Sequence, residues 1–199
     1  MEIREVSFRA SALKASDRPQ EWFPHIAVAG RSNVGKSSLL NWLMRQNKAR
    51  VAKAPGKTRM LNYFLINGSY FLVDLPGYGY AKVNRALQEE WGRELGNYLA
   101  TEERLAGVMT LVDVRHGPTE LDLGLQDMLI EHGRPRLVVL TKADKVKRGQ
   151  RARMQFQVQK KLGLPRPPLV VSVKTGEGRK ELLTRVDELI DGWRSKRST

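Results

Sequence analysis

An α/β fold built on a mostly parallel sheet is predicted by two features of the 199-residue sequence. Short runs of β-branched and other apolar residues alternate with longer amphipathic stretches, which is typical of strands joined by helices. Glycine-rich or polar motifs follow several of these runs, where a sheet of this type places its ligands. We therefore expect a six-stranded, mostly parallel sheet with one antiparallel edge strand and helices on both faces.

The individual elements are predicted from the hydrophobic periodicity of each stretch and from the turn-forming residues between stretches. Six runs are expected to be strands: 26–29, 61–66, 70–73, 108–112, 137–140 and 169–171. Asn67 and Gly68 form a two-residue hairpin signal, so the strands on either side of them are expected to be antiparallel. Five stretches are expected to be helices: 38–47, 88–99, 121–131, 151–162 and 179–193.

The first residues are harder to interpret. Val6, Phe8 and Ala10 alternate with polar residues, which is compatible with a short edge strand, and 16–24 is expected to be a connecting loop. We divide the chain into an N-terminal extension (1–24), one folded domain (25–194) and a basic C-terminal tail (195–199).

Composition excludes several classes of protein. The chain has no cysteine, which rules out disulfides, thiolate metal sites and a cysteine nucleophile and fits a reducing cytosol. No apolar run approaches the roughly 20 residues that span a bilayer, and the first residues lack a secretory signal pattern. We expect a cytoplasmic protein with no membrane partner. No sustained heptad or apolar stripe indicates an obligate dimer, so a monomer is expected.

The net charge of +14 is concentrated in parts of the chain. There is no acidic residue between Glu21 and Asp74, or between Asp144 and Glu177, and both stretches are rich in lysine and arginine. Fields of one sign attract polyanions, among which nucleic acids are the commonest cytosolic partner. The alternative is a solvated surface that only maintains solubility.

The string Gly-Arg-Ser-Asn-Val-Gly-Lys-Ser at 30–37 lies between a predicted strand and a predicted helix. Gly30 and Gly35 allow backbone geometry that directs N–H groups at phosphate oxygens, at the positive end of the helix. Lys36 is expected along the β- and γ-phosphates, and the Ser37 hydroxyl is expected to ligate Mg²⁺. The alternative is a chance match in a loop whose glycines and lysine serve only turn formation and solubility. The residues assigned to this phosphate site are Gly30, Arg31, Ser32, Asn33, Val34, Gly35, Lys36, Ser37 and Ser38.

Two further segments are expected to respond to the γ-phosphate. Asp74 is placed to reach the magnesium shell, and Gly77 is placed to bring its N–H to the γ-phosphate, although Asp-Leu-Pro-Gly alone is an ordinary turn sequence. Thr58 is the hydroxyl best placed to close onto the metal when GTP is bound. The metal ligands assigned are Ser37, Thr58 and Asp74. The nucleotide contacts assigned here are Pro55, Gly56, Lys57, Thr58, Asp74, Leu75, Pro76 and Gly77.

A Thr-Lys-x-Asp string and a Ser-Val-Lys string are expected to recognise the base. The Asp144 carboxylate can accept hydrogen bonds from guanine N1–H and the exocyclic amine, neither of which adenine offers there. Lys142 can lie along the ring, the Val173 amide can bind guanine O6, and Ser172 can support Asp144. A solvated turn is the alternative for Thr-Lys-x-Asp taken alone. The base-site residues assigned are Thr141, Lys142, Ala143, Asp144, Ser172, Val173 and Lys174.

Together the motifs predict a GTP-binding protein, and three strings at 30–39, 55–64 and 74–83 resemble the EngB (YihA/YsxC-type) family of translation-factor-related P-loop GTPases. The resemblance spans 26–193. It implies a small cytosolic GTPase domain involved in assembly of the large bacterial ribosomal subunit, in some members needed for growth and normal cell division. It places the phosphate loop at 30–38, the switch threonine at Thr58, the magnesium-side acid at Asp74 and the guanine contact at Asp144. Val173 departs from the alanine or leucine common there, but only its backbone is needed.

Hydrolysis is expected to be slow, because Tyr78 stands where Ras-like proteins have the glutamine that orients the attacking water. Asn33 resembles an asparagine through which related GTPases hold K⁺ against the phosphates. A purely structural role in the loop is the alternative. The catalytic residues assigned are Lys36, Asn33, Thr58 and Gly77. No general base is nominated, and the scattered histidines His25, His116 and His132 are expected to be structural or at the surface.

Two functions of different classes fit these observations. The first is a GTPase switch that docks on rRNA and proteins of a maturing large subunit and is released on hydrolysis, with Tyr78 and Tyr80 either reporting the nucleotide state or only packing. The second is a constitutive RNA- or ribosome-binding adaptor in which the nucleotide is mainly structural. A GTPase domain coupled to membrane transport or tRNA modification is disfavoured, because the segments such proteins add are absent from this sequence.

Overall fold

The computed structural model describes residues 2–12, 14–45, 60–78 and 85–197. The strands in chain order are β1 (Val6–Ala12), β2 (His25–Gly30), β3 (Leu61–Ile66), β4 (Tyr70–Asp74), β5 (Leu105–Asp113), β6 (Arg136–Thr141) and β7 (Leu169–Val170). The α-helices are α1 (Lys36–Met44), α3 (Arg85–Thr101), α4 (Glu120–Glu131), α5 (Arg148–Lys161) and α6 (Arg179–Ser195). Two 3₁₀ turns, Ala15–Asp17 and Ala143–Lys145, complete the described elements.

The described strands form one seven-stranded sheet in the order β1-β3-β4-β2-β5-β6-β7. All pairs from β4 to β7 are parallel, and β3 pairs antiparallel with both of its neighbours. The α/β class and the mostly parallel sheet are therefore confirmed. The expected count of six strands is corrected to seven, because β1 joins the sheet outside β3. The strand that runs opposite to the others consequently lies second from the edge.

The hairpin between β3 and β4 has the geometry that its sequence indicates. Asn67 and Gly68 both adopt positive φ, at 49° and 60°, as a type I′ turn requires. The Asn67 side chain also accepts hydrogen bonds from the N–H groups of Arg4 and Glu5 at 2.9 and 3.0 Å. This turn therefore anchors the start of the chain beside β3.

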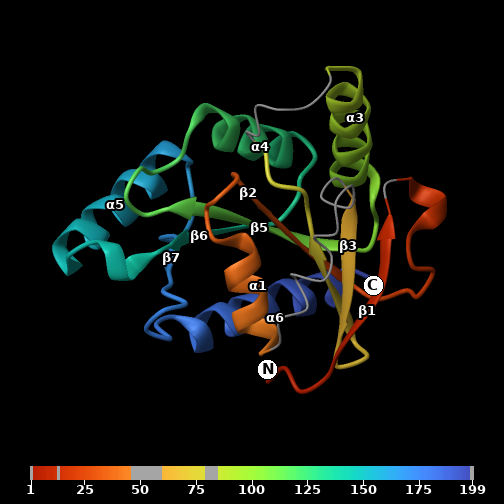
Figure 1. The fold of residues 1–199 in the computed structure, drawn as a ribbon, viewed down its shortest axis with the longest axis horizontal. Coiled ribbons are helices and arrows are strands. Elements are labelled where there is room, and N and C mark those ends of the chain that lie inside the picture. The colour runs from red at the N-terminus through yellow and green to blue at the C-terminus, as the bar shows by residue number, and fades with distance from the viewer. Residues whose placement is uncertain (1, 13, 46–59, 79–84, 198–199) are drawn as a thin grey trace.

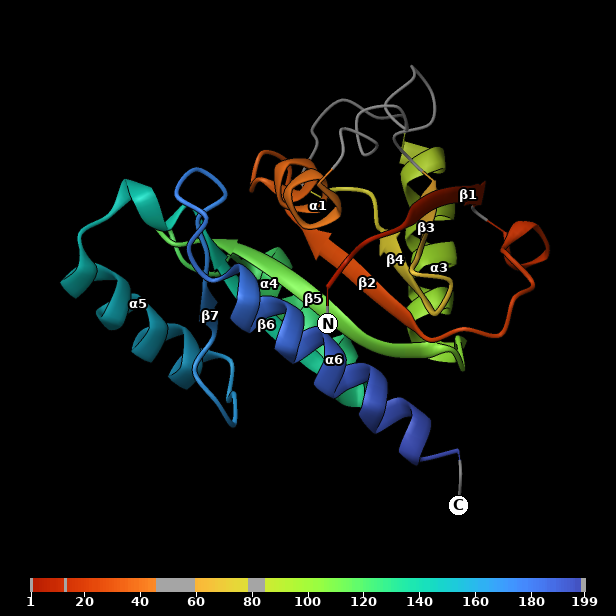
Figure 2. The same cartoon turned by 90° about the horizontal axis from the view of Figure 1, so that it is seen from below.

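Helices cover both faces of the sheet, with α1 and α6 on one face and α3, α4 and α5 on the other (Figures 1 and 2). The core on the first side is formed by apolar residues of the strands, α1 and α6, among them Leu39, Leu183 and Ile190. Every residue of β2 is buried, which explains the uninterrupted apolar run at 26–29. None of the helices in the described ranges has the length and apolar content needed to span a bilayer.

The loops at the carboxyl ends of β2, β4, β5 and β6 lie at one edge of the sheet, because these strands are parallel. A buried polar cluster occupies the opposite edge, around His25 at the start of β2 and Glu102 and Arg104 just before β5. The loops that carry the sequence motifs and the buried polar cluster therefore lie at opposite edges of the sheet.

Candidate nucleotide-binding site

The phosphate loop runs from the end of β2 into α1, as the sequence predicts. A Cβ atom on Gly30 would lie 2.8 Å from Val34 Cγ1 and 3.1 Å from Leu111 Cβ, so even an alanine there would force these neighbours to shift. Asn33 and Gly35 adopt positive φ, at 64° and 103°, and Gly35 is the N-cap of α1. The loop therefore turns sharply into the positive end of a helix, which is a ready anion-binding site.

Lys36 and Asp74 form an ion pair between Nζ and Oδ1 in this site. The pair is largely buried, with the side chains 12% and 9% exposed. Asp74 ends β4 and lies beside Val28 of the parallel strand β2, which explains how residues 38 positions apart meet. Since Ser37 follows Lys36 directly, a hydroxyl and a carboxylate come from adjacent elements, and this hard oxygen donor set fits Mg²⁺.

The segment after Asp74 runs alongside the phosphate loop. A Cβ on Gly77 would lie 3.5 Å from both Gly30 O and Ser32 N, and the Ser32 N–H donates to Tyr78 O at 2.9 Å. The Tyr78 hydroxyl donates to Asp122 Oδ1 of α4 at 2.6 Å. Burial, together with this hydrogen bond, raises the pKa of Tyr78 well above its ordinary value. The segment after Asp74 is thus linked to both the phosphate loop and α4.

Thr141 and Lys142 also contact the phosphate loop. Thr141 Oγ1 donates to Val34 O at 2.8 Å, and Lys142 Nζ donates to Asn33 O at 2.7 Å. The Lys142 ammonium is also 2.9 Å from Asp113 Oδ2 at the end of β5. Two residues assigned to base recognition therefore position the loop assigned to phosphate binding.

Asp144 is held by the following loop. Ser172 Oγ donates to Asp144 Oδ1 at 2.8 Å, and the Ala143 N–H donates to Val171 O at 3.1 Å. The hydrogen bond from Ser172 is the main cause that lowers the pKa of Asp144, so the carboxylate is ionised at neutral pH. Ser172 is fully buried, whereas Val173 is 37% exposed at the site. The arrangement presents an ionised hydrogen-bond acceptor at Asp144 beside the partly exposed residue Val173.

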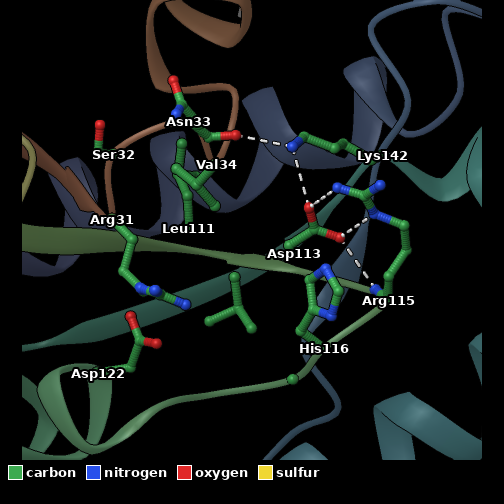
Figure 3. Close-up of a pocket in the computed structure, with 12 residues that line it drawn as sticks. Arg31, Ser32, Asn33, Val34, Leu111, Asp113, Arg115, His116, Asp122 and Lys142 are labelled. Carbon is green, nitrogen blue, oxygen red and sulfur yellow. Dashed lines mark hydrogen bonds and ion pairs between the residues drawn. The ribbon is translucent and has the colours of Figure 1, made fainter. Parts of the chain in front are cut away.

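A pocket of about 210 Å³ adjoins the phosphate loop. Figure 3 shows Asp113 between Lys142 and Arg115, with Arg31 and Asp122 on another wall. Arg115 donates to both Asp113 oxygens, at 2.9 and 2.7 Å. Burial alone would raise the pKa of Asp113, but the hydrogen bonds from Arg115 and Lys142 hold it well below its usual range.

Asp113, Arg115 and Asp122 are functional candidates that the motifs do not predict. Asp113 and Arg115 belong to an Asp-x-Arg sequence that matches no nucleotide motif, although its position at the carboxyl end of a parallel strand is a usable signal. Sequence alone places Asp122 only within an expected helix, with no signal for a role at the site.

Some assigned residues cannot be placed. Pro55, Gly56, Lys57 and Thr58 lie outside the described residues, as do Tyr80 and the part of the first acid-free stretch at 46–59. Of the histidines, His25 is fully buried against Tyr98, His116 lines the pocket and His132 is exposed.

The parallel sheet, the phosphate loop and the Thr-Lys-x-Asp loop define a P-loop GTPase, and residues 25–142 match the family described as 50S ribosome-binding GTPase. The probable GTP-binding protein EngB of Pelotomaculum thermopropionicum is 47% identical over 196 residues, which cover 97% of each chain. Its counterpart in Syntrophomonas wolfei is 44% identical over 191 residues, covering 96% of this chain and 99% of that one. The chain belongs to the EngB family of GTP-binding proteins, which confirms the resemblance of the motifs.

Solved structures agree with this assignment. The crystal structure of a probable GTP-binding protein EngB superposes with a TM-score of 0.72 at 25% identity, over 84% of this chain and 99% of that chain. Era of Aquifex aeolicus bound to GDP·AlF₄⁻ superposes with a TM-score of 0.64 at 21% identity, over 83% of this chain and 56% of that chain. The likeness to Era concerns the fold alone.

Proposed function

We propose that this protein is a slow GTPase that serves as a nucleotide-dependent switch in assembly of the large ribosomal subunit, and thereby supports growth and cell division. The observation that carries the switch is the contact between the segment after Asp74 and the phosphate loop, where Ser32 N–H binds Tyr78 O. A γ-phosphate bound at that junction lies within reach of both segments. The Tyr78 hydroxyl then transmits any displacement to Asp122 of α4.

In this proposal the nucleotide lies along the motif-bearing edge of the sheet. Lys36 and the N-terminus of α1 bind its phosphates, and Asp144 with the Val173 amide binds guanine. Ser37 and Asp74 would hold Mg²⁺, together with Thr58, which lies outside the described residues. When bound, the ion neutralises phosphate charge during hydrolysis. Gly77 is proposed to contact the γ-phosphate through its N–H.

Slow turnover is proposed because Tyr78 offers no water-orienting amide and its hydroxyl is already bound to Asp122. Asn33, whose backbone turns at positive φ in the phosphate loop, is proposed to hold K⁺ as an additional positive charge. Turnover should then be faster in KCl than in NaCl at equal ionic strength, and Asn33→Ala should abolish the difference. Equal rates of the wild type in the two salts would remove K⁺ from the proposal.

The large ribosomal subunit is proposed as the partner because the matching family is described as 50S ribosome-binding and the chain carries a net charge of +14. Attraction to rRNA phosphates by such a charge is strongly salt-dependent. We propose that the protein acts in the cytoplasm as a monomer.

Sedimentation of the tagged protein through a lysate gradient tests the switch. With a non-hydrolysable GTP analogue the protein should travel with free large subunits or their precursors, and with GDP much less of it should do so. Lys36→Ala should lose the response to the analogue, while the exposed control Lys180→Ala should keep it. A Lys36→Ala variant that still joins the particles fully would indicate a constitutive adaptor. Indifference of the wild type to nucleotide and salt would count against the switch.

A further inference from the structure

The start of helix α5 has a charge pattern that the stability of the helix does not favour. It contains five basic residues and no acidic residue between Arg148 and Lys161. Its first turn lacks the acidic residues that interact well with a helix N-terminus, and Arg148 and Arg151 stand there instead. No opposite charges are available for pairs along the helix. The cations at the start of α5 are therefore present at some cost to the helix, whereas Lys160 and Lys161 in its last turn suit the helix C-terminus.

The exposed face of α5 combines positive charge with one aromatic ring. Arg153, Phe156, Gln157 and Lys160 are exposed at helical spacing and therefore share a face, which we call the α5 face. Phe156 is 68% exposed, more than any other large apolar residue in the described ranges. The Arg153 and Lys160 side chains form no hydrogen bond or ion pair with the described residues, and their Cα atoms are about 10 Å apart along the axis.

Helix α5, which carries this face, lies at the outer edge of the molecule, beside β7 (Figures 1 and 2). The opposite side of the helix buries Val158, and Gln155 Nε2 donates to Pro168 O at 2.9 Å. Arg151 Nη1 donates to both carboxylate oxygens of Glu177, at 2.9 and 2.8 Å, in the loop that contains Ser172. The face is thus built onto the same loops that hold Asp144.

The neighbouring helix α4 has the opposite character. Its exposed residues include Glu120, Asp127 and Glu131. A polyanion approaching this side of the sheet is therefore repelled by α4 and attracted by α5. Charge complementarity favours nucleic acid over an acidic protein segment, because an exposed phenylalanine between two cations also matches a base between two phosphates.

We infer that the α5 face binds single-stranded RNA, with Arg153 and Lys160 on backbone phosphates and Phe156 stacked on an unpaired base. The inference rests on the proposed function in one respect, which is that the RNA belongs to the large ribosomal subunit. It assigns this contact to a face of the GTPase domain next to the guanine site.

Fluorescence anisotropy with a labelled 12-nucleotide oligouridine tests the inference, with protein-free large-subunit rRNA as a competitor. The double variant Arg153→Glu/Lys160→Glu should bind about tenfold or more weakly and show a shallower salt dependence. Phe156→Ala should bind about fivefold or more weakly with an unchanged salt dependence, because a lost stacking contact releases no counterions. Affinity for GDP should stay at the wild-type value in all variants, which shows that they are folded.

The matched control is Lys180→Glu/Lys196→Glu, in the first turn and at the C-cap of α6, which makes the same change in charge at the helix on the other face of the sheet. This control should keep the wild-type affinity for RNA within about twofold. Unchanged RNA binding by the α5 double variant, or an equal loss in the α6 control, would overturn the inference. So would a variant that binds RNA normally and loses a protein partner instead. If RNA binds through α5 but the wild type never sediments with large subunits, the proposed ribosomal function fails and the RNA-binding face stands.

Discussion

Asp144 reaches its position through contacts that the motifs make with one another. The Ala143 N–H binds Val171 O, and Ser172 Oγ binds the Asp144 carboxylate, so the two loops assigned to the base support each other. Lys142 in turn binds Asn33 O in the phosphate loop. A change in one motif therefore alters the position of the next.

Replacing Asp144 with alanine should weaken binding of GDP about 10- to 100-fold, because guanine loses the acceptor for its N1–H and amine. Isothermal titration calorimetry with GDP, GTP and ATP measures this, and Asp127→Ala, which removes an exposed carboxylate from α4, is the control. Equal affinity of the variant and the wild type for GDP, or wild-type binding of ATP as tight as that of GTP, would contradict the assignment.

At this scale the residues that could be predicted belong to strings of fixed spacing, such as Lys36 in the phosphate loop. The Tyr78–Asp122 hydrogen bond could not be predicted, because its partners are 44 residues apart and depend on how α4 packs. The Lys36–Asp74 ion pair does not follow from the sequence either, although both residues belong to the predicted site. Spacing identifies which residues are near a ligand, but not how they pair with each other.

Among the elements, the helices and the parallel strands could be located from periodicity because they are long or wholly apolar. The sequence of β1 is ambiguous, because alternation over a few residues predicts a strand weakly without knowledge of its partner. Glycines at element ends show the same limit of local sequence. Gly178 caps α6 with φ of +82°, and a Cβ there would lie 2.4 Å from Val170 O.

Two glycines of the same helix region should respond oppositely to alanine. Gly178→Ala should destabilise the protein by about 2 kcal/mol or more, since it combines backbone strain with a clash against backbone. Gly192→Ala should stabilise it by about 0.5–1 kcal/mol, because Gly192 lies exposed within α6 and a Cβ there would meet nothing within 4 Å. Urea denaturation measures both free energies of unfolding. A free energy of unfolding that is unchanged or increased in Gly178→Ala would show that the N-cap geometry of α6 does not require glycine.

At the scale of the whole molecule, the edge of the sheet opposite the site is held by a buried polar cluster. Arg104 Nε donates to Glu102 Oε1, and Arg104 Nη1 donates to Pro19 O, both at 2.7 Å, so the N-terminal segment is fastened to the start of β5. Burial lowers the pKa of His25 to about 3. Burial alone would raise the pKa of Glu102, but Arg104 and the other charges lower it to about 2.

The protein should lose stability as the pH falls from 7.5 to 5, by about 2 kcal/mol. Between its unfolded pKa of 6.5 and its folded pKa of about 3, His25 binds a proton only in the unfolded state, so each pH unit removes up to about 1.4 kcal/mol. Glu102 contributes only below its unfolded pKa of 4.5, outside this window. Chemical denaturation at several pH values should show a flatter profile for His25→Gln and an unchanged one for the exposed control His132→Gln. An unchanged slope in His25→Gln would contradict this.

The presence of β1 in the sheet has a consequence for how the protein can be truncated or tagged. β3 is buried throughout, and β1 satisfies the backbone groups along its outer side. A chain that lacks residues 6–12 would expose β3 as an edge strand with unpaired backbone N–H and C=O groups. Copies of such a chain are therefore expected to pair through β3 and aggregate into insoluble cross-β material. N-terminal deletions made for crystallisation or tagging should keep all of β1.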